Sequence, residues 1–212
     1  MSDFRIFDIK DIQPEPDILY LIDTNIWLSI LNARPHPKAR EQKYQNFLAA
    51  LRRTKVSPKP KVALPGFIVS EIINAGLNIK YKLFKTKNYR LPWTDNYKDD
   101  FKKLYRPSDD FKGDYELLCY ELKNYHQLFE IVNDGFEDFK LKQILRDLPT
   151  NLDYNDNYFY LLAKKRNYTI ITDDGDFFVP GVNIVTANNT LLSKHKDFIS
   201  TQEGTIPPNE NK

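Results

Sequence analysis

The chain has 212 residues, of which 41% are hydrophobic and 28% charged, and its formal net charge is +2. This length suits one domain with a substantial core, or one domain that carries an insertion, and is short for two full domains. The single cysteine, Cys119, excludes an intramolecular disulfide and fits a reducing compartment. Because no apolar run approaches the ~18 residues of a membrane-spanning helix and the N-terminus lacks a signal-peptide core, we expect a cytoplasmic protein without a membrane partner.

The charges are distributed unevenly along the sequence. Residues 34–61 contain nine Lys and Arg against one acid, and residues 80–106 contain nine against three. Residues 107–160 reverse this balance, with twelve Asp and Glu against five Lys and Arg. We therefore expect one basic and one acidic surface, although charge runs of this kind are also typical of solvated helix faces.

An apolar strand that ends in a carboxylate is the central feature of the N-terminal part. A short strand at residues 4–7 and a proline-containing leader precede an apolar run at residues 19–22, which is typical of a buried parallel strand and ends at Asp23. Thr24 and Asn25 are suited to cap the helix that follows. The next predicted elements are a helix at residues 38–55, a strand at 62–64 and a mostly apolar helix at 67–75.

The segment from residue 79 to residue 150 is rich in aromatic and charged residues with helical periodicity, and it contains no convincing strand. We predict three or four helices there, the longest from Gly113 to Asn133, as a helical insertion in a single domain of residues 1–199. The buried stripe predicted for that longest helix consists of Leu117, Leu118, Leu122, Leu128, Phe129 and Val132.

Alternation of helices and strands resumes after this segment. The predicted elements are a helix opened by Asp156, a strand at residues 168–172, the acidic turn Asp173-Asp174-Gly175-Asp176, a strand at 182–185 and a short helix at 188–194. The polar tail at residues 200–212 is expected to be disordered. This order of elements predicts an α/β fold with a central, mostly parallel sheet.

Carboxylates occur at several predicted junctions of the kind at which open α/β sheets bind ligands. Asp23 follows a buried strand, Asp156 opens a helix, and Asp174 belongs to the acidic turn after another strand. Each has a structural alternative, since Asp23 or Asp156 can simply cap a helix and the acidic turn can be solvated. Glu71 differs from them because it lies among apolar residues, where an unpaired carboxylate is costly and needs a metal ion, Lys or Arg as its partner.

A cluster of carboxylates requires a cation, since like charges repel one another at close range. Such a donor set favours Mg²⁺ or Mn²⁺, which prefer oxygen ligands. The three histidines, His36, His126 and His195, show no zinc-like spacing, and the lone cysteine completes no thiolate set. An all-oxygen site indicates phosphoryl chemistry, in which metal ions activate a water and offset charge on the scissile phosphate.

Four motifs carry these acids. They are Leu21-Ile22-Asp23-Thr24-Asn25, Val69-Ser70-Glu71-Ile72, the helix opened by Asp156, and Ile171-Thr172-Asp173-Asp174-Gly175-Asp176-Phe177. Together they resemble the motifs of PIN-domain nucleases of the VapC-like kind, whose Thr-x-Asp-x-Asp-Phe pattern falls here on Thr172, Asp174, Asp176 and Phe177. The resemblance covers roughly residues 18–78 and 150–195, and it implies a PIN-like, Rossmann-like α/β/α sandwich.

The resemblance also implies roles for individual residues. The implied catalytic metal ligands are Asp23, Glu71, Asp156 and Asp174, and the implied supporting residues are Thr24, Asn25, Thr172 and Asp176. The separation of 18 residues between Asp156 and Asp174 suits the helix–strand unit of the family. Asp156 is therefore chosen over Asp153, and Asp174 over Asp173.

These features predict an endoribonuclease that uses Mg²⁺ or Mn²⁺ to hydrolyse phosphodiester bonds in single-stranded or looped RNA. The resemblance implies the toxin of a type II toxin–antitoxin pair, with an antitoxin protein and a homodimer as partners. The leader and the long insertion make the chain larger than compact toxins, so an RNA-processing or DNA-directed PIN nuclease remains an alternative. A catalytically inactive PIN-like binding module is another. The aromatic rings between Lys80 and Arg106 either stack on unpaired bases or form the core of the insertion.

Overall fold

The protein is described here by a computed structural model that places residues 3–31, 38–55, 57, 59, 61–89, 100–146 and 152–203. In this part of the chain, strands form one sheet in the order β1-β6-β5-β2-β3-β4, and every pairing is parallel. The strands are β1 (Arg5–Asp8), β2 (Leu19–Ile22), β3 (Lys61–Pro65), β4 (Phe129–Val132), β5 (Thr169–Ile171) and β6 (Asn183–Thr186). The predicted α/β class with a central parallel sheet is confirmed.

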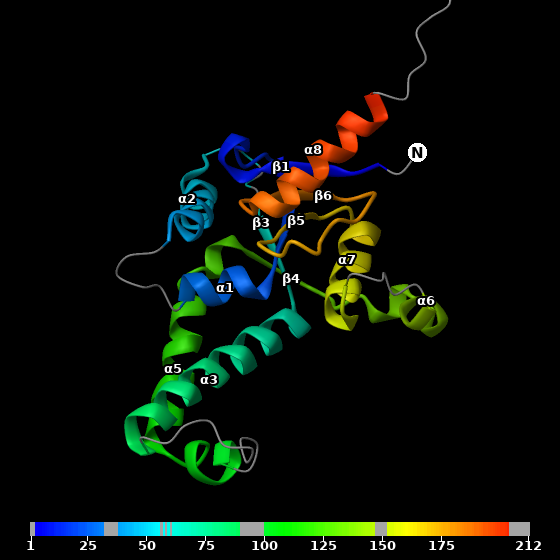
Figure 1. Cartoon of the computed structure of the whole chain (residues 1–212). Helices are drawn as coiled ribbons and strands as arrows, with labels where there is room; N and C mark the ends of the chain where they lie inside the picture. Colours follow the sequence, from blue (N-terminus) through cyan, green and yellow to red (C-terminus); the bar gives the residue numbers. More distant parts are fainter. Residues whose placement is uncertain are drawn as a thin grey trace, which may run out of the picture.

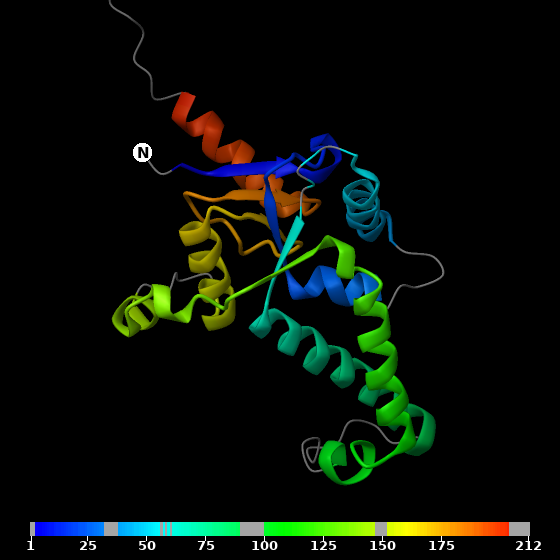
Figure 2. The same cartoon turned by 180° about the vertical axis from the view of Figure 1, so that it is seen from behind.

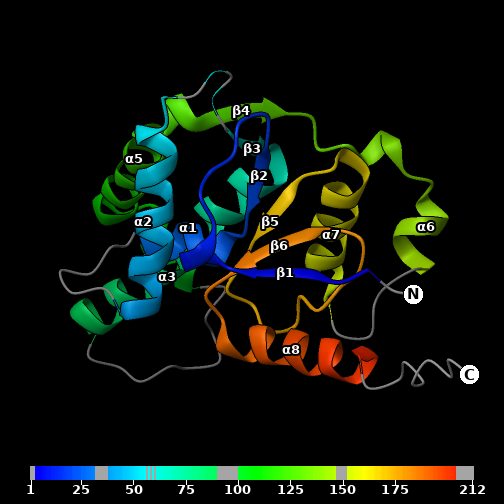
Figure 3. The same ribbon diagram turned by 90° about the horizontal axis from the view of Figure 1, so that it is seen from above.

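Helices lie on both faces of this sheet (Figure 1). The α-helices are α1 (Thr24–Leu31), α2 (Ala39–Arg53), α3 (Gly66–Tyr89), α5 (Asp109–Lys123), α6 (Leu141–Arg146), α7 (Tyr154–Arg166) and α8 (Asn189–Glu203). Figure 3 shows α1, α2, α3 and α5 gathered on one side of the strands and α7 on the other. This arrangement follows from right-handed crossovers, because the chain moves outward from β2 to β3 and β4, and then returns to β5 on the opposite side of β2.

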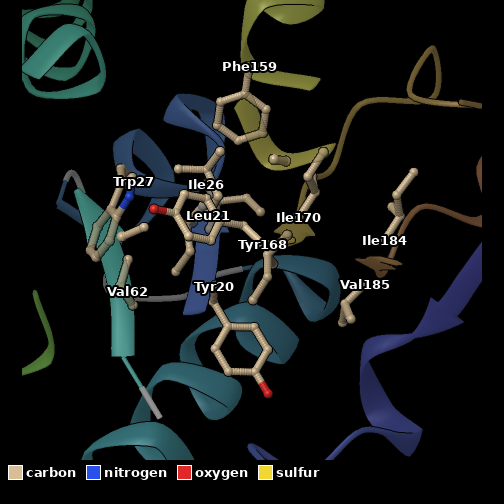
Figure 4. Packing of buried hydrophobic residues seen from close by; sticks show 14 of the residues in the cluster. Tyr20, Leu21, Ile26, Trp27, Val62, Phe159, Tyr168, Ile170, Ile184 and Val185 are labelled. Atoms are coloured by element: carbon tan, nitrogen blue, oxygen red, sulfur yellow. The ribbon is translucent and has the colours of Figure 1, made fainter. Parts of the chain in front are cut away.

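The core lies between the sheet and these helices. Figure 4 shows Leu21 of β2, Ile170 of β5 and Ile184 of β6 packed among the buried side chains, with Phe159 of α7 above them. Strand β2 is central, and its last three residues are almost completely buried. An apolar run of this kind, without alternation, is what a parallel strand covered on both faces requires. The first carboxylate after it is therefore held in a rigid part of the molecule.

The far halves of α3 and α5, joined through the π-helical turn η2 (Phe101–Tyr105), extend away from the sheet as an arm (Figures 1 and 2). Helices α3 and α5 pack closely because Gly76 has no side chain, and a Cβ atom there would lie 2.9 Å from Leu118 Cδ1. At the end of the arm, Tyr81 and Tyr105 are buried, and their ring centroids are 5.4 Å apart. The Tyr105 ring also packs against Phe101 and Phe111.

These contacts decide between the two roles predicted for the aromatic residues of this segment. Tyr81 and Tyr105 form the core of the arm, so the prediction that they stack on bases is wrong. Rings that already pack against one another in a small core have no free face for a nucleobase. Phe84 and Phe101 also pack against Tyr105, whereas Trp93 and Tyr97 lie outside the described residues.

The middle segment contains a strand, which corrects the prediction of an entirely helical insertion. Helix α5 ends at Lys123, so the predicted helix from Gly113 to Asn133 is wrong. A 3₁₀ turn, η3 (His126–Leu128), leads into β4, which pairs with β3 at the edge of the sheet. Phe129 and Val132 are spaced three residues apart, and that spacing imitates a helical stripe, although in a strand the two side chains point to opposite faces.

The ends of two other helices also differ from expectation. Helix α3 continues to Tyr89, far beyond the predicted helix at residues 67–75. Helix α8 continues through Glu203, beyond the predicted start of the tail at residue 200, whereas residues 204–212 lie outside the described part of the chain. Among the described residues, no helix combines the length and the apolar character needed to cross a bilayer.

Candidate active site

Strands β2 and β5 end side by side, and this brings the first two candidate residues together. Ile22 pairs with Ile171 in parallel register, so the next residue of each strand, Asp23 and Thr172, lies at the same edge of the sheet. The Asp23 backbone N–H continues the ladder by donating to the Ile171 carbonyl oxygen at 2.9 Å. The carboxyl ends of these two central strands therefore define the site, as they do in other open parallel sheets.

Asp23 is held from two directions and is only 8% exposed. Thr172 Oγ1 donates to Asp23 Oδ2 at 2.7 Å, and the Asn25 backbone N–H donates to Asp23 Oδ1 at 3.1 Å. The second contact is that of a helix cap, so Asp23, rather than the predicted Thr24 or Asn25, caps α1. Both alternatives considered for Asp23 thus apply at once, because the carboxylate caps a helix and also lies within the cluster of acids.

Glu71 reaches the same edge from the second turn of α3. Thr24 Oγ1, at the start of α1, donates to Glu71 Oε2 at 2.9 Å. The neighbouring Ile68 and Ile72 are buried, whereas Glu71 itself is half-buried. Glu71 therefore has a hydroxyl partner that fixes its direction but supplies no positive charge.

Asp153 and Asp156 divide two roles between them at the start of α7. Asp153 is the N-cap, and its Oδ1 accepts a hydrogen bond from the Asp156 backbone N–H at 3.0 Å. Asp156 lies in the first turn and is half-buried. Because α7 runs back across the sheet into β5, its first turn lies at the carboxyl edge of the strands. Asp153 therefore caps the helix. The Asp156 side chain is not used for capping, and it experiences the charges of the other acids.

The acidic turn after β5 is built by successive side-chain-to-backbone hydrogen bonds. Thr172 Oγ1 accepts from the Asp174 N–H at 3.0 Å, and Asp174 Oδ1 accepts from the Asp176 N–H at 2.9 Å. Phe177 then enters the core, 1% exposed, against Phe159. The Thr172 hydroxyl thus orients the Asp23 carboxylate by donating its proton, and it positions Asp174 by accepting a hydrogen bond from the Asp174 backbone N–H.

The neighbouring acids of this turn have basic partners. Arg40 Nε lies 3.0 Å from Asp173 Oδ2, and Lys194 Nζ lies 4.0 Å from Asp176 Oδ1. Within the described residues, no Lys or Arg forms an ion pair with any of the four candidate ligands. These four are Asp23, Glu71, Asp156 and Asp174. The positive charges near the site therefore do not compensate the repulsion among these four carboxylates.

The electrostatics show that these acids lie close enough to influence one another. The pKa of Asp23 is raised to about 6, mainly by burial and in smaller part by the charges of Asp174 and Glu71, while the hydrogen bonds from Thr172 and the Asn25 N–H oppose the change. Burial also raises the pKa of Asp156 to about 7, together with the charges of Asp153, Asp23, Asp174 and Glu71. A carboxylate whose ionised form is disfavoured by its acidic neighbours is suited to bind a cation.

The donor set fits a hard divalent cation in its chemistry but is not a closed cage. In the described part of the chain, no group of three or more His, Cys, Asp or Glu side chains is arranged to hold a metal ion. Glu71, Asp156 and Asp174 are partly exposed side chains, and they would have to converge on an ion bound next to the buried Asp23. Oxygen ligands with unbalanced negative charge favour Mg²⁺ or Mn²⁺ over softer metals.

Three residues that support this edge are not evident from the sequence. The Tyr44 hydroxyl of α2 contacts the Thr172 carbonyl oxygen at 3.0 Å and Asp173 Oδ1 at 2.9 Å, and it accepts from the Ala187 N–H at 2.8 Å. Asn188 Nδ2 donates to the Asp173 carbonyl oxygen at 2.6 Å. Asn157, next to Asp156, is completely buried, and neither of its amide atoms has a hydrogen-bond partner in the part of the chain that the structure describes.

Comparisons with known proteins give little beyond this geometry. No protein-family model matches the sequence, and no curated protein matches it. Seven chains of known structure are similar to it, and one belongs to the crystal structure of VapBC2 from Rickettsia felis bound to a DNA fragment from their promoter. That chain is 15% identical, the TM-score is 0.42, and the similarity covers 79% of this chain and 97% of that chain. A similarity this weak assigns no activity, which must come from the site.

Proposed function

We propose that this protein is a PIN-like endoribonuclease that requires Mg²⁺ or Mn²⁺ and hydrolyses phosphodiester bonds in RNA. The observation that supports it most is the assembly of carboxylates at one sheet edge, where burial and mutual repulsion raise the pKa of Asp23 to about 6 and that of Asp156 to about 7. Such an arrangement is unfavourable for folding unless a bound cation compensates it. Perturbed acids gathered at one site are typical of function rather than of structure.

The residues of the site divide into acids and the groups that orient them. Asp23, Glu71, Asp156 and Asp174 would hold the metal. Thr172 and the Asn25 N–H fix the Asp23 carboxylate, and Thr24 fixes that of Glu71. A bound divalent cation would supply activation of the attacking water and compensation of charge on the scissile phosphate. The hydroxyls of Thr172 and Thr24 fix the orientation of the carboxylates. Because they carry no charge, they do not neutralise the carboxylates as a bound metal ion would.

The direct test is incubation of total RNA with the wild type and with Asp23→Asn in Mg²⁺ or Mn²⁺, followed by mapping of the cut ends. We expect defined cuts from the wild type that are lost in Asp23→Asn and in the presence of a chelator. Asp197→Asn, which changes an exposed acid of α8 outside the site, is the matched control and should retain most of the activity. Cuts common to the wild type and Asp23→Asn would mean contamination and contradict the proposal.

We propose that the biological role is that of the toxin of a type II toxin–antitoxin pair, with an antitoxin protein as partner and a homodimer as the assembly. Induced expression should then arrest growth, and Asp174→Ala should relieve the arrest at equal protein level. Growth without arrest, together with RNA cleavage in vitro, would instead favour an RNA-processing or DNA-directed nuclease. Comparison of RNA and DNA substrates separates these two.

A catalytically inactive binding module is the second candidate. It is favoured by one observation, namely that no three described acids are arranged to hold a metal ion. A Mn²⁺ titration by isothermal calorimetry separates the candidates, because the nuclease should bind the ion and Asp23→Asn should not. No binding by the wild type, or equal binding by both proteins, would favour the module.

A further inference from the structure

A second pocket lies at the edge of the sheet opposite the carboxylates. It has a volume of 450 Å³ and is formed by the last turn of α2, the end of α5 and η3. Lys59 stands two residues before β3, and Lys123 and His126 stand just before β4, so this pocket faces the amino ends of the parallel strands. The end of α2 packs against η3 there, as can be followed in Figure 3. We call it the basic pocket.

Four basic side chains and no acidic side chain line the basic pocket: Arg52, Lys59, Lys123 and His126. The Arg52 guanidinium lies over the ring of Tyr125, 5.5 Å from its centroid, and is thereby oriented. His126 Nδ1 lies 3.0 Å from the Lys123 carbonyl oxygen, which fixes the imidazole against the end of α5. Among the described residues, none of the four basic groups forms an ion pair with Asp or Glu.

A purely structural role explains only part of this arrangement. Arg52 and Lys123 lie in the last turns of α2 and α5, where positive charge balances the helix dipole. Lys59 lies in a loop and His126 in a 3₁₀ turn, and neither position needs such balance. Convergence of like charges costs free energy, and a bound anion relieves it. The volume is within the range of ligand sites.

The basic pocket is connected to the acidic edge by a longer groove. A cavity of 1110 Å³ runs along α1 from Asn25, whose N–H donates to Asp23, as far as Arg52 and Tyr125. Arg52, Asn124 and Tyr125 line both cavities. Helix α1 has eight residues and is therefore about 12 Å long. Residues of α2, α3 and α5 form its other walls, and these include Lys80 as well as the acids Glu41 and Glu121.

We propose that the basic pocket binds backbone phosphates of a single-stranded RNA that lies along α1 and reaches the carboxylate edge. Arg52 and Lys123 contact phosphate oxygens, and Asn124 and Gln127 line the same pocket with neutral hydrogen-bonding groups. The identity of the strand as RNA rests on the proposed function. Binding of the phosphates does not depend on cleavage and can be measured without metal.

The experiment measures binding of a fluorescent oligouridylate of about twelve nucleotides in chelator, as a function of salt. We expect Lys123→Gln to weaken binding about fivefold at about 0.1 M salt, and to reduce the slope of log K against log salt by about 0.7, the value for one phosphate contact on a single strand. Lys123→Arg retains the charge and should restore wild-type binding. Lys196→Gln on the exposed face of α8 is the matched control for loss of one positive charge.

Three results would overturn the proposal. One is wild-type affinity and salt slope in both Lys123→Gln and Arg52→Gln. Another is an equal loss in Lys196→Gln, which would mean unspecific attraction by net charge. Binding of polyglutamate in place of the RNA would assign the pocket to an acidic protein segment and also overturn it. Failure of the wild type to cut RNA in Mn²⁺ would contradict the proposed nuclease but leave this binding measurement unchanged.

Discussion

Asp23 combines two tasks that conflict in free energy. As the cap of α1 it accepts the Asn25 N–H, which favours its ionised form, whereas burial and the charges of Glu71 and Asp174 disfavour that form. The unfavourable contributions prevail, since the pKa rises to about 6. A buried carboxylate in this state costs stability at neutral pH, and the cost is the expected counterpart of a functional site.

This conflict predicts that Asp23→Asn stabilises the metal-free protein. Asn keeps the size and the cap but removes the buried charge, so we expect the free energy of unfolding at about pH 8 to rise by about 1–3 kcal/mol. Urea denaturation in chelator measures it. Added Mn²⁺ should stabilise the wild type and leave Asp23→Asn unchanged. A variant that is less stable than the wild type in chelator would show that Asp23 is structural.

Thr172 offers a test of orientation at the same scale. Thr172→Val removes the proton donated to Asp23 and the acceptor of the Asp174 N–H, whereas Thr172→Ser keeps the hydroxyl. We expect Thr172→Val to lower the Mn²⁺ affinity about tenfold, as loss of outer-shell partners does at other metal sites, and Thr172→Ser to retain most of it. Calorimetric titration measures both. Equal affinities would remove Thr172 from the site.

Local chemistry distinguishes the candidate ligands from the acids beside them in the sequence. Asp153 and Asp156 are three residues apart, and the structure gives the cap to Asp153. Asp173 has Arg40 as its partner, whereas Asp174 has no such partner among the described residues. Tyr44 could not be predicted, because its contacts join residues more than 120 positions apart and no local pattern marks them.

At the scale of elements, the Tyr44 hydroxyl of α2 connects the acidic turn to the sheet by hydrogen bonds. Tyr44 contacts the Thr172 carbonyl, the Asp173 carboxylate and the Ala187 N–H. Burial raises the pKa of Tyr44 well above its usual value, so the hydroxyl stays protonated and can donate. The turn that carries Asp174 is thereby attached to a helix outside its own crossover.

Tyr44→Phe should therefore loosen the turn. The Ala187 N–H loses its buried acceptor, and we expect a loss of about 1–3 kcal/mol in the free energy of unfolding together with weaker Mn²⁺ binding. Tyr20→Phe is the matched control, since the Tyr20 hydroxyl accepts from the Glu15 N–H away from the acids. It should reduce stability without changing Mn²⁺ affinity. The same loss of Mn²⁺ affinity in both variants would mean that global stability alone controls the site.

Strand β4 shows where element prediction from this sequence fails. Its four residues are buried in part and exposed in the middle, and Ile131 is 78% exposed. The partly buried residues, Phe129 and Val132, stand at its two ends rather than at alternate positions, so the strand shows no alternation, and the preceding leucines continue the helical spacing into it. Strands β2 and β5 were predictable because both of their faces are covered, which gives a continuous apolar run.

For the whole molecule, the raised pKa values predict a dependence of stability on pH. Asp23 and Asp156 have folded pKa values of about 6 and about 7, against an ordinary value of 3.8. Their protonation stabilises the folded state fully below the ordinary value, and this contribution is lost as the pH rises through the folded values. In chelator, stability relative to the Asp23→Asn and Asp156→Asn double variant should therefore fall between about pH 4 and about pH 7.

Thermal unfolding at a series of pH values measures this difference. Saturating Mg²⁺ should flatten or reverse the fall, because a cation replaces the protons. A difference that is constant with pH in chelator would contradict the interaction among the acids.

One helix, α3, carries Glu71 near its beginning and the buried rings of the arm near its end. Its 24 residues form a rod about 36 Å long. Asp23 is anchored in the centre of the sheet, so a tilt of this rod changes the separation of the two carboxylates without altering either one locally. The arm and one of the four candidate ligands are therefore parts of one continuous helix, so a rigid displacement of the arm is transmitted directly to Glu71.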